Sequence, residues 1–455
     1  MSGSSSGSGV TRRRLLLGTA AAAAGAGVAF RPGKAPAQGG AKPFAGTTLN
    51  VSCWSGTYPK LLADYIPEFE EQTGMRVNYD TPGFPVYNQR ADLELSTQGS
   101  AFDVLNITFI YVSRWIGAGW FTPLDEFLND PNRTPPDWGD AGDFIGGAID
   151  PLKDRNGVVH GIPWVADASV AVASRYDLIE RAGLRMPETF DEMAEVLQAV
   201  HGQDGVAGYV NENHHGWAWI PYLHGFGGDV FRGPPDDLMP TLDTPEAIEA
   251  AEWYGRVLRE WSPDGILSYT YDQAVQALKS GRANYCTHSI AFLAPVGEAD
   301  SRVADTVAYA MMPAGPAGRF PGTAAHGWGI PTGARNKDAS WEFIRWATSK
   351  EMFRRLLTER GYGSITRRSL VETPEFRQRM TINGHDVGRL FVDVLDLAAE
   401  KGYMAYRTVH VFPQASQQIN KAIEVVASQQ MPAKEAMQQA QAQLVSELRR
   451  AGVRL

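Results

Sequence analysis

Ten residues with aromatic or hydrogen-bonding side chains stand at or near points where predicted strands, turns or helices begin or end. They are Trp54, Tyr58, Asn106, Thr108, Trp164, Asp167, Trp217, Trp219, Trp328 and Arg407. Sugars present apolar C–H faces and a rim of hydroxyl groups. Aromatic planes suit the faces, whereas carboxylate, amide and guanidinium groups suit the rim. We therefore expect these ten residues to bind a ligand.

Other aromatic residues fit the hydrophobic core better. Four tryptophans are assigned to packing: Trp115, Trp120, Trp341 and Trp346. His326 and Trp328 lie between Gly322 and Gly329, and these glycines predict a turn in which the backbone can approach a ligand closely. Trp328 therefore stays among the candidate ligand contacts.

No metal-binding or catalytic motif stands out. His214, His215 and His224 are close in sequence but fit no common zinc spacing, and we expect the first two to form hydrogen bonds in a loop. The chain lacks the Gly-x-Ser-x-Gly elbow and the Gly-x-x-x-x-Gly-Lys-Ser/Thr phosphate loop. We predict no catalytic residues, no metal and no cofactor.

Charge and cysteine content exclude other classes. The 455 residues include 42 basic residues, 51 acidic residues and two cysteines. Without the first 37 residues, the chain has 37 basic and 51 acidic residues and a net charge of −14. Such an acidic body repels phosphate backbones, so a nucleic-acid partner is not expected. Two cysteines cannot form a disulfide scaffold or a cysteine-rich metal site.

The N-terminus has the form of an export signal. Three consecutive arginines, Arg12 to Arg14, precede a weakly apolar stretch rich in alanine and glycine. Ala35-Pro36-Ala37 then supplies a small-x-small cleavage site. We predict a twin-arginine signal peptide over residues 1–37, cleaved near Ala37, which places the mature chain in the periplasm. No later stretch is long and apolar enough to span a membrane.

The remaining pattern alternates strands and helices. Strands are predicted over 48–54, 75–79, 101–107 and 283–287. A helix is expected over 60–73, with a kink at Pro67 and a cap at Gly74. Thr189 and Thr244 are predicted N-caps, and two amphipathic helices occupy the C-terminal region. Alternation of this kind predicts mainly parallel sheets covered by helices.

Nine landmarks in a fixed order resemble family 1 extracellular solute-binding proteins, the maltose-binding-type receptors of ABC importers. They occupy residues 49–56, 69–74, 101–104, 161–164 with 174–178, 242–247, 281–285, 327–331, 339–344 and 412–414. Two segments depart from the family pattern, residues 287–289 and residues 407–409. Because both segments face the cleft in the family, the departures leave the identity of the solute open.

The resemblance implies an α/β fold of two discontinuous lobes joined by a hinge, each lobe a mainly parallel sheet flanked by helices. We expect the N-terminal lobe to comprise residues 44–170 and 305–355, and the C-terminal lobe residues 171–304 and 356–455. A ligand would be enclosed between the lobes when they close. Cys53 and Cys286 would lie in different lobes, so we expect both to be free and buried.

Three functions stay open. The first is an exported, monomeric binding protein that captures a sugar or sugar-like solute and delivers it to a membrane ABC permease. The second is a receptor for a polyamine, which would need several carboxylates in the cleft, or for a glycerol phosphodiester, which would favour Arg407. The third is a periplasmic enzyme that acts on polysaccharide.

Overall fold

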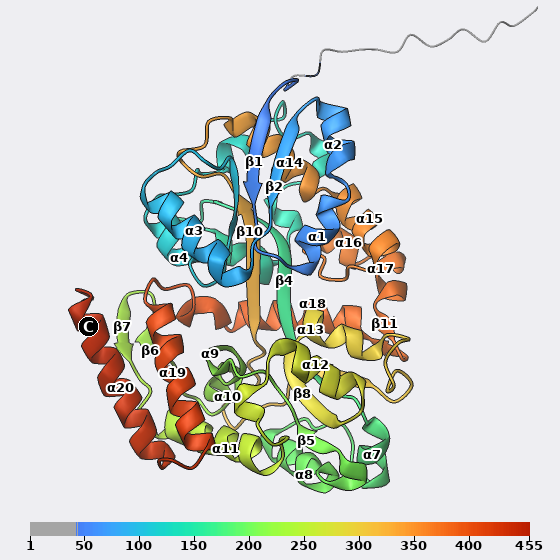
Figure 1. Ribbon diagram of the computed structural model, residues 1–455, viewed down its shortest axis with the longest axis vertical. Coiled ribbons are helices and arrows are strands. Elements are labelled where there is room, and N and C mark those ends of the chain that lie inside the picture. The colour runs from blue at the N-terminus through green and yellow to red at the C-terminus, as the bar shows by residue number, and fades with distance from the viewer. Residues whose placement is uncertain (1–41, 43) are drawn as a thin grey trace, which may run out of the picture. The chain divides into compact units, whose positions relative to one another are not determined.

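The computed structural model describes residue 42 and residues 44–455 (Figure 1). The predicted signal peptide, residues 1–37, lies outside the described residues. An eight-stranded sheet runs through the described chain in the order β2-β1-β3-β10-β4-β8-β5, with β9 beside β4. These strands are β1 (Thr48–Ser52), β2 (Arg76–Asp80), β3 (Val104–Ile107), β4 (Ile162–Ala173), β5 (Ala207–Tyr209), β8 (Ala283–Ser289), β9 (Ala308–Met311) and β10 (Thr323–Gly329).

Strand β4 belongs to both halves of the sheet. Its residues from Ile162 to Ala168 pair with β10, and its residues from Ser169 to Ala173 pair with β8 and β9. We call the part built on β1, β2, β3 and the start of β4 the first lobe, and the part built on β5, β8, β9 and the end of β4 the second lobe. In Figure 1, β4 and β10 run vertically between the two lobes.

The two-lobe α/β fold is as expected, but the sheet is mixed rather than mainly parallel. Strand β1 is parallel to β2 and β3, and β5 is parallel to β8. The crossing strands β4 and β10 run antiparallel to each other and to their other partners. The cause is the return of the chain through the hinge, which reverses the direction of β10.

The lobe boundaries also need adjustment. Strand β9 pairs with the second-lobe part of β4, although the sequence boundaries put residues 305–355 in the first lobe. We propose that the chain returns to the first lobe within β10. We further propose that the first lobe extends through α15 (Lys350–Arg360), because α15 packs against α1 (Thr57–Ala63).

Helices surround the sheet in both lobes. Those labelled in the upper part of Figure 1 are α1, α15, α2 (Ile66–Thr73), α3 (Phe84–Ser96), α4 (Val112–Gly117), α14 (Lys337–Ala347), α16 (Arg368–Val371) and α17 (Pro374–Arg379). Two short helices, α5 (Asp125–Leu128) and α6 (Gly146–Ile149), follow α4 in the chain. The lower part includes α7 (Tyr176–Arg181), α8 (Phe190–Val200), α9 (His215–Ala218), α10 (Ile220–Gly225), α11 (Pro245–Glu260), α12 (Tyr271–Lys279), α13 (Ile290–Leu293), α19 (Phe412–Ala427) and α20 (Ala433–Arg450).

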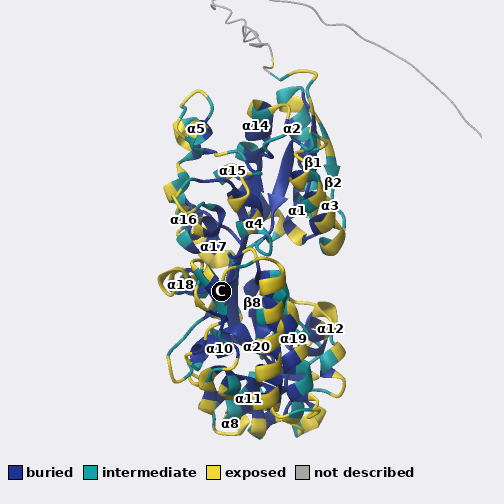
Figure 2. Cartoon of the chain, turned by 90° about the vertical axis from the view of Figure 1, so that its left-hand side faces the viewer, coloured by how far each residue is buried: buried dark blue, intermediate teal, exposed yellow. Residues whose placement is uncertain are grey.

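Helix α18 (Val387–Glu400) lies along the crossing and contacts both β4 and α6. Two small hairpins complete the structure: β6 (Phe231–Gly233) with β7 (Asp237–Pro240), and β11 (Thr381–Ile382) with β12 (His385–Asp386). Figure 2 shows the sheet buried between helices whose outer faces are exposed. No helix in the described part of the chain is long and apolar enough to cross a membrane.

Local capping signals are confirmed. The Thr244 side chain accepts a hydrogen bond from the Ala247 amide at the start of α11, and Thr189 caps α8 in the same way. Gly74 ends α2 with a φ of 75°, which glycine adopts without strain. The helix expected over 60–73 is instead two helices, because the chain breaks before Ile66 and Pro67 stands in the first turn of α2.

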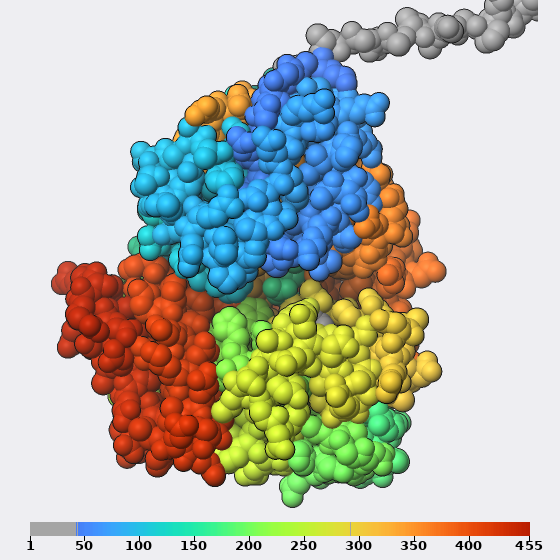
Figure 3. All heavy atoms as spheres, viewed as in Figure 1, coloured from blue at the N-terminus to red at the C-terminus, as the bar shows by residue number. Residues whose placement is uncertain are grey.

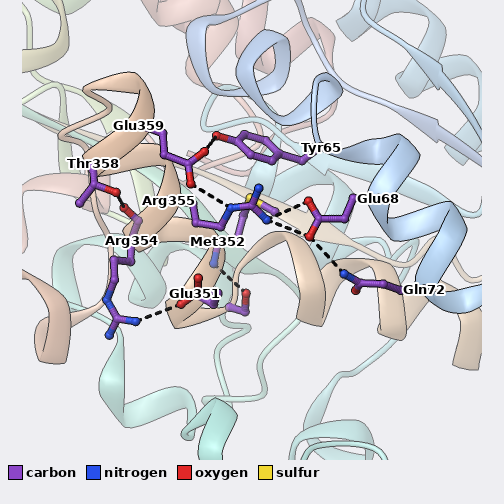
Figure 4. A network of polar contacts seen from close by, with 10 residues as sticks. Tyr65, Glu68, Gln72, Glu351, Met352, Arg354, Arg355, Thr358 and Glu359 are labelled. Carbon is purple, nitrogen blue, oxygen red and sulfur yellow. Dashed lines mark hydrogen bonds and ion pairs between the residues drawn. The ribbon is translucent and has the colours of Figure 1, made fainter. Parts of the chain in front are cut away.

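Ion pairs and hydrogen bonds connect α15 to α2 and to the residue before it in the first lobe (Figure 4). The Arg355 guanidinium donates to both carboxylate oxygens of Glu68 at 3.0 and 2.9 Å, and to Glu359 at 3.2 Å. It also lies 4.5 Å from the centre of the Tyr65 ring. The Tyr65 hydroxyl donates to Glu359 at 2.9 Å, which closes the network.

Arg367, unlike Arg355, is entirely buried. Arg367 lies between the rings of Trp138 and Phe144, with its guanidinium carbon 4.2 and 4.3 Å from their centres. It donates to the Thr348 carbonyl at 2.8 Å and to the Asp143 carboxylate at 2.9 Å. Burial lowers the pKa of Arg367 to about 10, although Asp143 opposes this shift. Asp143 is therefore the counter-ion that makes burial of this cation tolerable.

We expect Asp143→Ala to lower the free energy of unfolding by about 3 kcal/mol, since it leaves a buried guanidinium without its carboxylate. Urea unfolding followed by circular dichroism would measure this loss. Arg354→Ala, which removes the exposed pair with Glu351, is the control and should change stability by less than about 0.5 kcal/mol. Equal effects of the two substitutions would show that the buried pair has no special role.

Both cysteines are free and buried in the structure. Cys53 follows β1 in the first lobe, and Cys286 lies within β8 in the second lobe. Burial raises the pKa of each thiol well above its ordinary value. Neither thiol therefore forms the reactive thiolate at neutral pH.

Candidate ligand-binding site

Four aromatic side chains of the first lobe and of the crossing strand β10 form an aromatic wall: Trp54, Phe84, Phe109 and His326. Trp54 follows β1 and Phe109 follows β3, at the carboxyl ends of parallel strands where open α/β sheets collect ligands. Ring centres of neighbouring members are 5.1 to 6.4 Å apart. Phe84 opens α3, and His326 belongs to β10.

His326 is held in one tautomer. The Trp54 indole N–H donates to Nδ1 of His326 at 3.3 Å, so the imidazole proton is on Nε2. Burial lowers the pKa of His326 to about 3, and the imidazole is neutral at physiological pH. The turn expected from Gly322 and Gly329 is not present, because His326 and Trp328 belong to strand β10.

The second lobe brings a polar cluster to the same place. His288, at the end of β8, contacts Glu212 with 3.1 Å between Nε2 and the carboxylate. The Ser289 amide donates to Nδ1 of His288 at 2.8 Å, so His288 donates from Nε2 to Glu212. Burial alone would raise the pKa of Glu212, but the hydrogen bond from His288 and the nearby histidines lower it below its ordinary value. Glu212 is therefore ionised.

Arg407 connects the two lobes. Its guanidinium carbon lies 4.8 Å from the ring centre of Phe109 and 4.3 Å from that of Trp217, and these two rings are 6.0 Å apart. Nη1 donates to the Thr323 carbonyl at 3.4 Å, whereas Nε and Nη2 are buried without a hydrogen-bond partner. Arg407 is thus 1% exposed, and its guanidinium stacks among aromatic rings instead of pairing with a carboxylate of the described residues.

Asp167 supplies a negative charge near the point of β4 where pairing changes from β10 to β8 and β9. One of its carboxylate oxygens accepts a hydrogen bond from the Ser289 hydroxyl at 2.7 Å. Burial raises the pKa of Asp167, although Ser289, His288 and Arg407 each lower it. Asp167 and Arg407 influence each other electrostatically but do not form a direct ion pair. Both charges thus retain hydrogen-bonding capacity.

Tyr271 stands at the rim of the site, as the first residue of α12. Its side chain is 41% exposed, yet desolvation and the charges of Asp167, Asp272 and Glu212 all raise the pKa of its hydroxyl. Tyr271 is therefore partly open to solvent, and the charges of Asp167 and Glu212 act on its hydroxyl. Figure 3 shows a furrow on this face of the molecule, between the blue N-terminal atoms and the yellow and red atoms below.

The structure brings together five of the ten candidate residues. Trp54, Trp164, Asp167, Trp217 and Arg407 border the site or contact a residue that does. The other five lie in the core away from the site: Tyr58, Asn106, Thr108, Trp219 and Trp328. Trp164, Trp217 and Arg407 are also buried, so it is their contacts and not their burial that place them at the site.

Two of these candidates, Asn106 and Tyr58, support the site through Trp164. Asn106 accepts a hydrogen bond from the Trp164 indole at 2.9 Å, and Tyr58 stacks on Trp164 with 4.8 Å between ring centres. Thr108 donates to Asn88 at 3.0 Å. Trp164 packs in turn against His326, at 5.6 Å. We therefore leave the five out of the contacts proposed for the ligand.

Sequence reasoning missed Phe84, Phe109, Glu212, Tyr271 and Ser289. Phe109 could have been found, since it follows the same strand as Asn106 and Thr108. The others depend on how the lobes are placed.

His214 and His215 have pKa values lowered by burial. Among the described residues, no group of three or more histidine, cysteine, aspartate or glutamate side chains could hold a metal ion.

The comparison with protein families decides the class. The profile of bacterial extracellular solute-binding proteins matches residues 55–352, more than half of the chain. This protein belongs to the bacterial extracellular solute-binding protein family.

Curated relatives of this solute-binding protein are distant. It is 27% identical over 288 residues to the mannitol-binding protein of Pseudomonas aeruginosa, and the match spans 62% of this chain and 64% of that protein. It is 23% identical over 346 residues to the erythritol/L-threitol-binding protein of Mycolicibacterium smegmatis, with 72% of each chain covered.

Solved structures show the same fold. A solute-binding protein of Agrobacterium vitis with bound D-mannitol gives a TM-score of 0.75 at 22% identity, with 89% of this chain and 99% of that chain covered. A solute-binding protein of Agrobacterium radiobacter in complex with ribitol also gives 0.75, at 20% identity and the same coverage.

His326 makes stability depend on pH. The unfolded chain protonates this histidine near its ordinary pKa of 6.5, whereas the folded protein does so only near 3. Between these values the unfolded state binds one proton more, so this group destabilises the fold by about 1.4 kcal/mol per pH unit as pH falls. We predict a slope shallower by that amount in His326→Asn, measured by urea unfolding at pH 6, 5 and 4. Identical slopes would show that His326 is not buried as a neutral imidazole.

Proposed function

We propose that this protein captures a neutral polyhydroxylated solute, a sugar or a sugar alcohol, between Asp167 and Arg407. The observation that carries the proposal is a partly buried carboxylate and a buried guanidinium in one site that do not pair with each other, with two guanidinium nitrogens that have no hydrogen-bond partner among the described residues. A hydroxyl group can donate to the carboxylate and accept from the guanidinium, so neighbouring hydroxyls satisfy both charges at once.

The aromatic wall complements the other surface of such a solute. Trp54 and Phe109 offer apolar faces from the first lobe, and Trp217 offers one from the second. A solute that contacts both lobes stabilises the closed state relative to the open one. Bound solute would thus convert a chemical signal into a change of shape that a permease can recognise.

Charged solutes fit this site less well. A polyamine would gain from Asp167 and Glu212 but would leave Arg407 buried without a partner. A phosphodiester would satisfy Arg407 but would approach Asp167 with like charge. The relatives named for mannitol and erythritol support the neutral class.

The rest of the functional proposal follows the family. Its members are extracellular, which supports export of this chain with a signal peptide cleaved near Ala37, and in our proposal through the twin-arginine route to the periplasm. We propose a monomer that delivers its solute to a membrane ABC permease. Relatives named as binding proteins favour a binding role over a polysaccharide-degrading enzyme.

A thermal-shift screen on protein that begins at Gln38 tests the solute class. The panel is D-mannitol, ribitol, erythritol, D-glucose, maltose, spermidine and glycerophosphocholine. At 100 times its dissociation constant a ligand adds about 2.7 kcal/mol, so we expect a saturable rise of about 5 °C with at least one neutral solute. A rise with spermidine or glycerophosphocholine alone would contradict the neutral class.

Substitutions of the two charges test the site itself. We expect Asp167→Asn and Arg407→Lys each to weaken binding of the responding solute about 100-fold in calorimetric titration, since each removes charge-assisted hydrogen bonds in a buried site. Arg90→Ala removes an exposed arginine of the first lobe and should leave affinity unchanged. Unchanged affinity in both site variants would place the solute elsewhere.

A further inference from the structure

Glu212 is a second ionised carboxylate beside the proposed site, and it plays no part in the proposed binding of a neutral solute. It lies three residues after β5, and His288 is the last residue but one of β8, which runs parallel to β5. Both residues thus stand at the carboxyl ends of parallel strands of the second lobe, as Trp54 and Phe109 do in the first. This is the edge at which open α/β sheets collect ligands.

Hydrogen bonds fix the backbone that carries Glu212. The Asn211 side-chain amide donates to the Thr287 carbonyl at 3.1 Å, and its oxygen accepts from the Glu212 amide at 2.9 Å. The next residue, Asn213, donates its amide proton to the Tyr269 carbonyl at 2.9 Å. The segment is thus attached to β8 on one side and to the residues before α12 on the other. Glu212 is therefore held in place without a solute.

His288 supports Glu212 and has both ring nitrogens engaged. Nδ1 accepts from the Ser289 amide at 2.8 Å, and Nε2 donates to Oε1 of Glu212 at 3.1 Å. The bond from His288 uses one of the two carboxylate oxygens. The Glu212 side chain is 21% exposed, whereas the His288 side chain is 8% exposed. The second oxygen of Glu212, Oε2, can therefore accept a hydrogen bond from a hydroxyl group.

Consecutive residues of β8 hold the two carboxylates of the site. His288 binds Glu212, and Ser289 binds Asp167 at 2.7 Å. The charges of both carboxylates act on the hydroxyl of Tyr271, the residue at the rim. Glu212 and Asp167 therefore border the same part of the site.

His288 also connects Glu212 to Arg407, through Trp217. The Trp217 ring centre lies 5.9 Å from that of His288 and 4.3 Å from the guanidinium carbon of Arg407. The site thus contains two carboxylates and one guanidinium, each held by neighbours of its own. A solute with several hydroxyls can offer a separate hydroxyl to each of these groups.

We propose that Glu212 is a specificity-determining residue that accepts a hydrogen bond from a solute hydroxyl through Oε2. This inference rests on the proposed function and adds a third contact to those with Asp167 and Arg407. An ionised carboxylate accepts hydrogen bonds but cannot donate one, so it favours a free hydroxyl over a hydrogen atom at the same position of the solute. Glu212 thus selects the solute by its pattern of hydroxyl groups.

Glu212→Gln tests this role because glutamine can keep the contact with His288. Its carbonyl oxygen can accept the hydrogen bond from His288, and its amide nitrogen then replaces Oε2 with a donor. The variant therefore loses the acceptor that faces the solute and retains the support of the histidine. If Glu212 acted only by holding His288, this variant would bind solutes as the wild type does.

Calorimetric titration with deoxygenated probes gives the measurement. The parent probes are D-mannitol, ribitol and D-glucose, and each is compared with its monodeoxy analogues, which lack one hydroxyl at a time. In the wild type, we expect one analogue to bind at least about tenfold more weakly than its parent. In Glu212→Gln the parent should weaken by a similar factor, and that analogue should bind within about twofold of the parent, because the two changes remove the same hydrogen bond.

Three further variants keep the result interpretable. Asp167→Asn should weaken the parent probe but still discriminate against the same analogue, since Asp167 binds a different hydroxyl. Glu212→Asp withdraws the carboxylate by one methylene group, and it should lose the discrimination if Glu212→Gln does not fold. Glu249→Gln changes an exposed glutamate of α11 and should behave as the wild type does.

The outcomes separate this inference from the proposed function. Wild-type protein that binds every analogue as tightly as its parent overturns the role of Glu212 and leaves the proposed function standing. Folded Glu212 variants that discriminate against the analogues as the wild type does overturn it as well. Wild-type protein that binds no parent probe overturns the proposed function, and the inference falls with it.

Discussion

The change of partners along β4 is the constraint on which the rest of the structure depends. One strand of twelve residues pairs with β10 in the first lobe and with β8 and β9 in the second, so the two lobes share a backbone at their boundary. Asp167 stands beside that boundary and reaches Ser289 at the end of β8. Asp167 thus connects the crossing strand to the second lobe, and the proposed site is built around it.

The second feature of the site is a carboxylate and a guanidinium, those of Asp167 and Arg407, that do not bind each other. Arg367, the other buried arginine among the described residues, is paired with Asp143. Arg407 is stacked among aromatic rings and donates to a carbonyl, but two of its nitrogens are unused. Asp167 is close enough to be influenced by it and does not bind it. Such an arrangement costs stability unless a third group joins the two charges, and hydroxyl-rich solutes can do so.

Sequence alone predicted what local chemistry determines. The caps at Thr189 and Thr244, the end of α2 at Gly74 and the lobe-forming alternation of strands and helices are local signals, and the structure has them. The proposed site includes only half of the residues expected from sequence, because the placement of these side chains depends on strand register. A shift between His326 and Gly327 leaves Trp164 without a partner on β10, so side chains that a regular strand would place differently gather around Trp164. Tyr58 and Trp328 lie in the core, whereas Phe109 and His326 border the proposed site.

A crystal structure of the protein with the solute that gives the largest thermal shift tests the central claim most directly. Our account predicts electron density for the solute between Asp167 and Arg407, with solute hydroxyls in hydrogen-bond contact with both side chains and an apolar face of the solute against Trp54, Phe109 or Trp217. Density for the solute elsewhere in the molecule, with no contact to Asp167 or Arg407, would contradict it.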